Sequence, residues 1–244
     1  PVLKYDRFPL PDLLDDLLDL AREGMGCAVE FEFSITLSDT AGQRGTFNIL
    51  QMRPMTTGTG MLEESVADSD AARALCYSTQ ALGHGRRQTI ADIVFVRPDT
   101  FDPKNTVAIA QSIASLNQAL NRGGRPYLLM GPGRWGSFDR WLGIPVKWQD
   151  IDGVGAIVEI RNETLKAEPS HGSHFFQHIT VNDIPYLTVT EGSTDVIDWA
   201  SLLSLPQTFS NGYLTHVTLP RPLLIKCDGR HSRAVVLLEA GEVQ

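Results

Sequence analysis

The feature that most constrains the fold is an apolar run, an amphipathic stretch and a second apolar run, in that order. The apolar runs are residues 91–96 and 127–130, and between them apolar side chains recur at helical spacing over residues 103–120. A strand–helix–strand order favours two parallel strands joined by a crossover helix. Further short strand patterns follow at residues 154–160, 184–189, 214–217, 223–225 and 234–239. We therefore expect an α/β domain whose mixed sheet has a parallel core and antiparallel additions.

The beginning of the chain follows a different pattern. Pro11 opens a leucine-rich helical repeat, which ends near Gly24. Residues 28–37 and 46–53 then alternate between polar and apolar side chains, with a polar turn between them. This alternation is typical of two antiparallel strands, so we predict a β-hairpin with a long loop.

The boundary between these two patterns is a stretch rich in Thr, Gly, Ser and acidic residues, at residues 56–70. Such a composition is typical of a linker. We therefore predict two domains, residues 1–60 and residues 61–244. The chain begins at Pro1 and reaches its first helical pattern almost at once, so we expect an excised piece of a larger polypeptide.

Composition and charge narrow the functional classes. The formal net charge is −8 and the pI is near 5.2, which argues against a nucleic-acid surface, because such surfaces need Lys and Arg to contact phosphates. No apolar run is long enough to cross a bilayer, so we expect no membrane partner. Cys27, Cys76 and Cys227 lie far apart, which favours a reducing, cytoplasmic location over a disulfide framework.

The predicted hairpin carries the clearest chemical signal. Alternate side chains of a strand share a face, so Glu30 and Glu32 point one way on the first strand. Ile49, Gln51 and Arg53 are expected to share a face on the second strand. If the two polar faces coincide, one surface presents carboxylate and amide oxygens together with a guanidinium group. The oxygens suit Mg²⁺, and the guanidinium group suits phosphate. The alternative is a solvated cross-strand Glu–Arg pair without a ligand.

These residues also resemble a known family. The Glu-Phe-Ser tripeptide that begins at Glu32, followed by the Ile-Leu-Gln-Met-Arg-Pro run around Gln51 and Arg53, resembles the end of the ATP-grasp domain in the phosphoenolpyruvate synthase and pyruvate phosphate dikinase family. The resemblance implies that Glu32 and Gln51 lie near Mg²⁺ and the ATP phosphates, and that Arg53 contacts phosphate or nucleotide. Glu30 is the alternative metal-facing carboxylate, because it shares the face of Glu32. The resemblance gives no catalytic residues.

The reaction implied by this resemblance is ATP-dependent phosphotransfer from ATP to pyruvate through a phosphohistidine. The sequence contains neither the Thr-x-His segment of a phosphohistidine domain nor a pyruvate-binding barrel. We therefore expect ATP, Mg²⁺ and pyruvate to belong to the intact parent enzyme, with further domains of the same polypeptide as partners. The chain alone is expected to be inactive. An ATP-grasp phosphotransferase acting on another acceptor is the alternative.

The second predicted domain contains a glycine-rich loop. Residues 131–136 match the pattern G-x-G-x-x-G and follow a predicted strand, so Gly131 and Gly133 are candidates for close approach to a phosphate, with Arg134 supplying charge. Pro132 removes one backbone donor from this loop. The alternatives are a structural turn, or an anion site closed by Arg134. An anion- or nucleotide-binding regulatory module is therefore the second functional hypothesis. Residues 131–147, with residues 169–177, also resemble a C-terminal region of phosphoenolpyruvate synthase-like proteins.

Histidine and tryptophan side chains give two further expectations. His171, His174 and His178 have spacings that place them on one side of a helix predicted over residues 171–179, which is compatible with a transition metal. Capping and packing roles are the alternative. Three tryptophans are expected in the core or in a lid: Trp135, Trp141 and Trp148.

Overall fold

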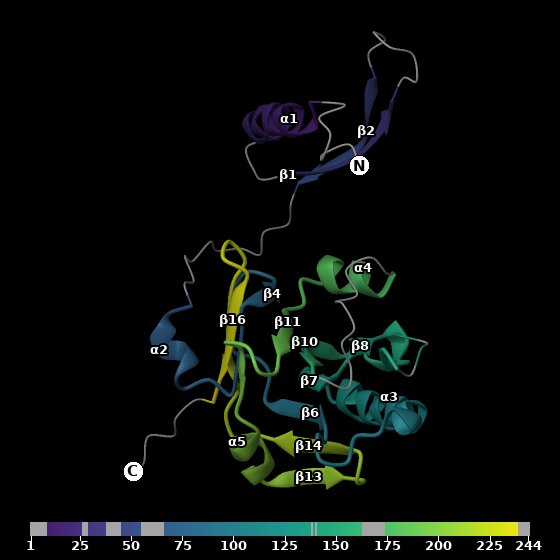
Figure 1. Ribbon diagram of the computed structural model, residues 1–244, viewed down its shortest axis with the longest axis vertical. Coiled ribbons are helices and arrows are strands. Elements are labelled where there is room, and N and C mark those ends of the chain that lie inside the picture. The colour runs from purple at the N-terminus through teal and green to yellow at the C-terminus, as the bar shows by residue number, and fades with distance from the viewer. Residues whose placement is uncertain are drawn as a thin grey trace. The chain divides into compact units, whose positions relative to one another are not determined.

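The chain divides into two compact units, residues 1–61 and residues 62–244. The computed structural model (Figure 1) describes residues 9–25, 29–37, 45–54, 66–137, 139, 141–162 and 174–238. Most of the linker predicted at residues 56–70 lies outside this set. None of the helices in these described ranges is both long and apolar enough to span a membrane.

The described residues of the first unit form one helix and one antiparallel pair of strands (Figure 1). Helix α1 spans Leu10–Met25, and strands β1 and β2 span Val29–Thr36 and Thr46–Pro54. These elements agree with the predicted helix and hairpin. Residues 38–44 of the predicted loop lie outside the described residues.

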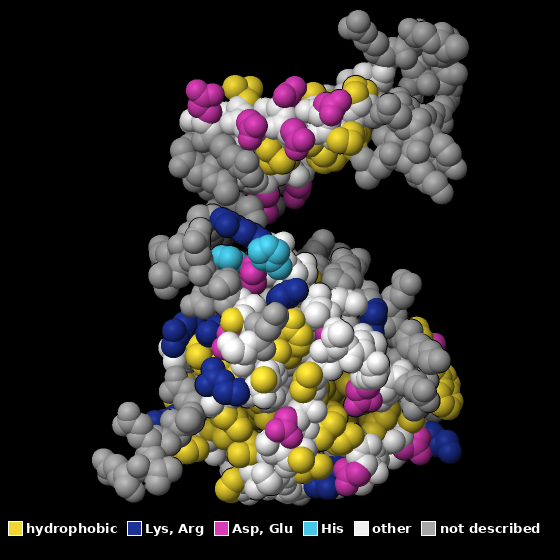
Figure 2. All heavy atoms as spheres, turned by 60° about the vertical axis from the view of Figure 1, so that its left-hand side comes forward, with side chains coloured by type: hydrophobic (Ala, Val, Ile, Leu, Met, Phe, Trp, Pro, Cys, Tyr) yellow, Lys and Arg dark blue, Asp and Glu magenta, His cyan; other side chains and the backbone are white. Residues whose placement is uncertain are grey.

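The two faces of this hairpin differ in exposure. Along β1, burial alternates residue by residue: Val29 is buried, whereas Glu30 and Glu32 are exposed. Helix α1 packs against β1 and is amphipathic; Figure 2 shows a row of acidic side chains (magenta) along it, with hydrophobic side chains (yellow) beside them. The polar face of the hairpin is therefore the open one.

The second unit is built on a seven-stranded sheet with a parallel centre. Strands β6, β7, β10 and β11 are neighbours in that order and run parallel. Strands β14 and β13 extend one side and β4 extends the other, all in antiparallel pairings. The bounds are β4 Gln80–Leu82, β6 Asp92–Val96, β7 Tyr127–Pro132, β10 Val154–Arg161, β11 Tyr186–Thr190, β13 Gln207–Ser210 and β14 Leu214–Thr218. The mixed α/β sheet predicted from the sequence is confirmed.

One face of this sheet is covered by the segments that connect the parallel strands. Ile109 and Ile113 of α3 pack with Val94 and Leu129 of the strands beneath. Alternate strand residues point to opposite faces, and Ile93 accordingly packs on the other side. The connecting elements are η1 Pro103–Asn105, α3 Thr106–Arg122, β8 Arg134–Trp135, β9 Gly143–Ile144, η2 Trp148–Asp150 and α4 His174–Val181.

The opposite face is covered by a separate five-stranded antiparallel sheet, in the order β12-β3-β16-β15-β5. Its bounds, with the two remaining helices, are β3 Cys76–Ser78, β5 Gly85–Arg87, β12 Val196–Ile197, β15 Leu224–Asp228, β16 Arg233–Leu237, α2 Asp68–Ala71 and α5 Trp199–Ser204. Phe95 and Met130 of the large sheet pack with Ile225 and Val236 of the small one. The strands predicted at residues 223–225 and 234–239 are present as β15 and β16, but they belong to this second sheet and not to one mixed sheet. A sheet with a parallel centre is buried on both faces, and these strands supply its second cover.

A buried ionic cluster joins three strands at the amino-terminal edge of the parallel centre. Asp92, only 2% exposed, accepts a hydrogen bond of 2.9 Å from Nε of Arg125 and another of 2.9 Å from the hydroxyl of Thr218. Nε2 of His216 lies 2.7 Å from the same carboxylate. Because these partners come from β14 and from the segment before β7, the cluster fixes the start of β6 between its neighbours.

Candidate functional site

The polar face of the hairpin brings together the residues predicted to bind nucleotide. In the β1–β2 ladder Glu30 lies opposite Arg53, and Glu32 lies opposite Gln51. Residues directly opposite each other in an antiparallel pair share a face. Glu30, Glu32 and Gln51 are exposed, and the backbone register puts the position of Arg53 on the same face. One open surface therefore presents two carboxylates, an amide and the position of a guanidinium group.

A β-bulge corrects one part of the expected pattern. The register shifts after Glu32, so that Phe33 lies opposite Ile49 and Leu50 is the extra residue. Ile49 consequently shares the face of Phe33, not that of Gln51. The sequence analysis expected strict alternation along this strand, and the inserted residue breaks it. The bulge directly follows the Glu32–Gln51 pair, and it ends the run of polar pairs on this face.

The Glu32–Gln51 pair provides oxygen ligands of the kind that Mg²⁺ prefers. Mg²⁺ is commonly held by one or two carboxylates together with phosphate oxygens and water, and not by a cage of protein ligands alone. The described residues contain no group of three or more His, Cys, Asp or Glu side chains that could hold a metal. Glu32 and Gln51 offer two oxygen-bearing side chains on one exposed face, which is the smaller kind of ligand set that Mg²⁺ uses. Because Glu30 lies opposite Arg53, Glu32 is the better placed of the two carboxylates.

The glycine-rich loop of the second unit is shaped by a buried indole ring. Gly131 and Gly133 lie at the end of β7, and the chain continues into β8 and not into a helix. A Cβ atom on Gly131 would lie 2.7 Å from the ring of Trp135, which is 1% exposed. Gly133 has a φ of +69°, a value that favours glycine. Packing and turn geometry account for both glycines, and the described residues that follow form strand β8 where a dinucleotide loop would open a helix.

A buried carboxyl group lies beside this loop. Glu159 of β10 is fully buried, and the hydroxyl of Tyr186 donates a hydrogen bond to its Oε2. Burial raises the pKa of Glu159 to about 7, while the Tyr186 hydrogen bond and the positive charges of Arg161 and Arg134 act in the opposite direction. Arg134, the predicted anion contact, therefore lies in the electrostatic environment of a protonatable acid.

Two polar atoms of this cluster have unused hydrogen-bonding capacity. Within the described ranges, Oε1 of Glu159 and Nε of Arg161 are buried without a hydrogen-bond partner. Buried polar atoms are normally paired, and the backbone N–H of Trp135 also acts on the Glu159 carboxyl group, so Nε of Arg161 is the clearer of the two candidate contacts for another group. The sequence analysis missed Glu159, although a lone charge inside an apolar strand is unusual and was a usable signal.

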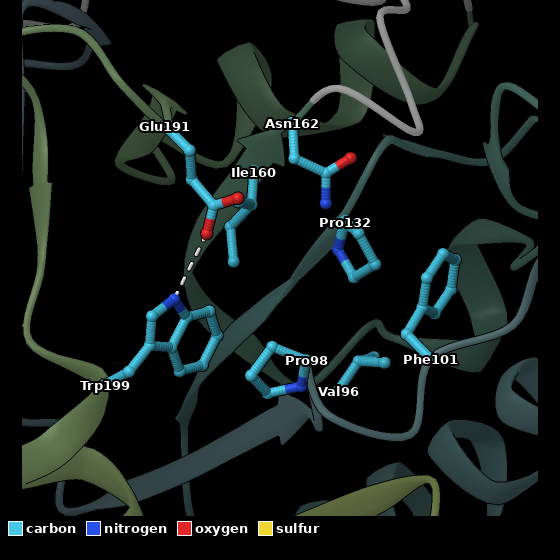
Figure 3. Close-up of a pocket in the computed structure, with 8 residues that line it drawn as sticks. All are labelled: Val96, Pro98, Phe101, Pro132, Ile160, Asn162, Glu191 and Trp199. Carbon is cyan, nitrogen blue, oxygen red and sulfur yellow. Dashed lines mark hydrogen bonds between the residues drawn. The ribbon is translucent and has the colours of Figure 1, made fainter.

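A cleft lies at the carboxyl ends of the parallel strands (Figure 3). It has a volume of about 170 Å³ and lies where the loops after β6, β7, β10 and β11 meet. Ligands in α/β proteins commonly bind at this edge of the sheet. The cleft is lined by Val96, Pro98, Phe101, Pro132, Ile160, Asn162, Glu191 and Trp199. The sequence analysis proposed none of these residues as site residues, although Asn162 and Glu191 directly follow predicted strands.

The structure gives different outcomes for the predicted roles of the histidines and the tryptophans. The ring of His178 stacks on Trp148, with centroids 5.0 Å apart and planes inclined by 9°, which is a packing role. His171 and the side chain of His174 lie outside the described residues. Trp135 is in the core as expected, but Trp141 is 60% exposed, so a core role for Trp141 is wrong.

Comparisons of this chain with protein-family models, with curated proteins and with solved structures return no match.

Proposed function

We propose that residues 1–61 contribute part of the Mg²⁺–ATP site of a phosphotransferase resembling phosphoenolpyruvate synthase. In this proposal they form the end of an ATP-grasp domain, and the remaining walls of the nucleotide cleft come from other domains of the same polypeptide. The observation that carries the proposal is the cross-strand placement of Glu32 opposite Gln51 and of Glu30 opposite Arg53 on one open face.

The roles follow from the chemistry of the side chains. The carboxylate of Glu32 and the carbonyl oxygen of Gln51 are the atoms that would hold Mg²⁺, which neutralises phosphate charge when bound. Arg53 would donate hydrogen bonds to phosphate oxygens, because a guanidinium group matches their geometry. Glu30 lies opposite Arg53 and would orient it. Pyruvate is the acceptor that the family resemblance implies, through a phosphohistidine carried by another domain.

The exposure of apolar side chains in this unit also supports a partner domain. Leu20 is 67% exposed, Leu50 is 65% exposed and Met52 is 44% exposed. Apolar groups of this size gain free energy when another surface covers them. In a larger nucleotide-binding domain, neighbouring parts of that domain would cover these apolar side chains of the helix and the hairpin.

Titration of Mg²⁺–ATP into the chain, followed by calorimetry, tests this proposal. We expect weak binding, because only part of the cleft is present, and a loss of about tenfold or more in Gln51→Ala or Arg53→Ala. Asn48→Ala is the matched control: Asn48 is exposed and lies on the same face, beyond the bulge. Binding that is equal in all four chains would overturn the proposal, as would steady phosphoenolpyruvate production by this chain alone.

A second candidate function is favoured by the cluster around Glu159. Arg134 and Arg161 act electrostatically on this buried acid at the carboxyl edge of the sheet, and Nε of Arg161 is buried without a partner among the described residues. Residues 62–244 would then form an anion- or nucleotide-binding regulatory module. Nucleotide binding that survives Gln51→Ala and Arg53→Ala but is lost in Arg134→Ala would favour this function over the first.

A further inference from the structure

The cleft of Figure 3 lies between two loops that leave the sheet toward opposite faces. The loop after β6 carries Pro98 and Phe101 and leads to α3 on the helical face. The loop after β11 carries Glu191 and leads to Trp199 and α5, which pack on the other face. Strands β7 and β10 lie between β6 and β11, so the cleft lies at the carboxyl ends of four neighbouring parallel strands, the edge of the sheet at which α/β proteins commonly bind ligands.

The walls of the cleft suit a flat ring. Trp199 and Phe101 supply aromatic surfaces, and Pro98 and Pro132 lie between them (Figure 3). Planar heterocycles stack on such surfaces. A cavity of about 150 Å³ accepts one benzene molecule, so the 170 Å³ of this cleft encloses about one six-membered ring, the size of the pyrimidine half of a fused heterocycle. A drug-sized ligand needs several times that space.

The polar groups at the cleft are an acceptor and a donor. Nε1 of Trp199 donates a hydrogen bond of 3.2 Å to Oε1 of Glu191, which fixes the carboxylate at the rim, and its second oxygen points toward Ile160 (Figure 3). The side-chain amide nitrogen of Asn162 points into the cleft from another strand end (Figure 3). A carboxylate accepts two adjacent N–H groups, and an amide N–H donates to a carbonyl or ring nitrogen.

We propose that this cleft binds a planar heterocycle with the 2-amino-4-oxopyrimidine edge that guanine and pterins share. Such a ring presents two adjacent N–H donors to Glu191 and a carbonyl acceptor to Asn162, while Trp199 stacks on it. Adenine lacks this pattern, because a ring nitrogen acceptor stands next to its amino group and would face the carboxylate. The inference concerns the same unit as the second candidate function, but it rests on the cleft alone and is independent of the anion site at Arg134 and of the hairpin.

The test uses the indole N–H signals of the ¹⁵N-labelled chain in NMR spectra. The sequence has four tryptophans, and the signal of Trp199 is identified by its loss in Trp199→Phe. The ligands are GMP, AMP and pterin. We expect GMP or pterin to shift the Trp199 signal while the Trp148 signal stays in place. GMP and AMP carry the same ribose phosphate, so their difference reports the base alone. A stronger effect of pterin than of GMP would identify pterins as the ligand source.

Two variants test the named contacts. Glu191→Gln keeps an oxygen acceptor for Trp199 but removes the charge, and Asn162→Ala removes the amide; each is expected to weaken binding of the responding ring by about tenfold or more. Asp16→Asn, at an exposed position of α1, is the matched charge control and should bind normally. AMP binding equal to that of GMP, no response to GMP or pterin, or full binding by Glu191→Gln would each overturn the inference.

Inorganic phosphate separates this inference from the anion site at Arg134. If phosphate shifts no NMR signal of the chain and GMP shifts the Trp199 signal more than AMP does, the proposed anion site is disproved and the cleft inference stands. The opposite result, a phosphate response lost in Arg134→Ala with no discrimination between GMP and AMP, would overturn the cleft inference and leave the anion site.

Discussion

The hydroxyl group of Tyr186 on β11 donates a hydrogen bond to Glu159 on the neighbouring strand β10, in a region closed to solvent. Glu159 is fully buried and Tyr186 is 2% exposed. Burial raises the pKa of Glu159 from 4.5 to about 7, so the native chain keeps this proton over a pH range in which the unfolded chain loses it. The free energy of unfolding therefore falls as pH rises through that range.

Replacing Glu159 with Gln tests this pH dependence. The amide keeps the shape but cannot ionise, so the wild type should lose stability relative to Glu159→Gln between pH 4.5 and pH 7, by on the order of 3 kcal/mol. Denaturation followed by tryptophan fluorescence measures it, because all four tryptophans lie in the second unit. Glu23→Gln, at an exposed position, is the control. A stability difference that does not change with pH would contradict the assignment.

The Asp92 cluster predicts a large loss of stability from a single change of charge. Asp92→Asn leaves Arg125 and His216 without their carboxylate. The side chain of Arg125 is 45% exposed, whereas Asp92 and His216 are buried, so we expect a loss of about 1–3 kcal/mol, chiefly from the weakened buried hydrogen bonds. Asp99→Asn is the matched variant, because Asp99 pairs with Arg97 at 2.8 Å with its side chain 51% exposed. That pair should contribute less than about 1 kcal/mol. The free energy of unfolding is measured by urea denaturation. Equal losses in the two variants would contradict the role of Asp92 in fixing the start of β6.

The contact between Gly131 and the ring of Trp135 predicts a steric effect. Gly131→Ala places a methyl group 2.7 Å from a ring that is 1% exposed, so overpacking should cost about 1–3 kcal/mol and shift the tryptophan emission. In the control, Gly24→Ala, no atom lies within 4 Å of the added methyl group, so no clash is expected and the tryptophan emission should stay unchanged. An unchanged melting temperature and emission in Gly131→Ala would show that the loop accepts a side chain there.

Burial also predicts the reactivity of two thiols. The pKa of Cys76 is raised above its ordinary value, chiefly by burial, and burial raises the pKa of Cys227 to about 12. The thiolate is the reactive form, so both cysteines should resist alkylation by iodoacetamide at pH 8 until the chain is unfolded. Peptide mapping by mass spectrometry checks this, and rapid labelling of either residue in the native chain would contradict its buried environment.

The elements that sequence analysis predicted are those with a long, regular period. Helix α3 follows the apolar spacing that includes Ile109 and Ile113, and the strands on either side are continuous apolar runs. The polar face of the hairpin was also predictable, because Glu30 and Glu32 alternate with phenylalanines. In both cases the decisive information lies within one short stretch of sequence.

The parts that were not predictable depend on contacts between distant residues. Strands β3, β5 and β12 have two or three residues each, too few to establish a period, so the second sheet was missed. The extra residue Leu50 changes a register that alternation alone cannot reveal. Glu159 meets Tyr186 only because β10 and β11 pair. The cleft likewise forms from four strand ends whose order is a property of the folded sheet.

The most direct test of the central proposal is to replace Mg²⁺ with Mn²⁺ in the presence of ATP and to measure the paramagnetic broadening of backbone amide signals by NMR. The account predicts that broadening is strongest at Glu32 and Gln51, requires ATP, and falls about tenfold or more in Glu32→Gln. Broadening that is centred on the exposed acidic residues of α1, Asp15 and Asp16, or that is unchanged in Glu32→Gln, would contradict it.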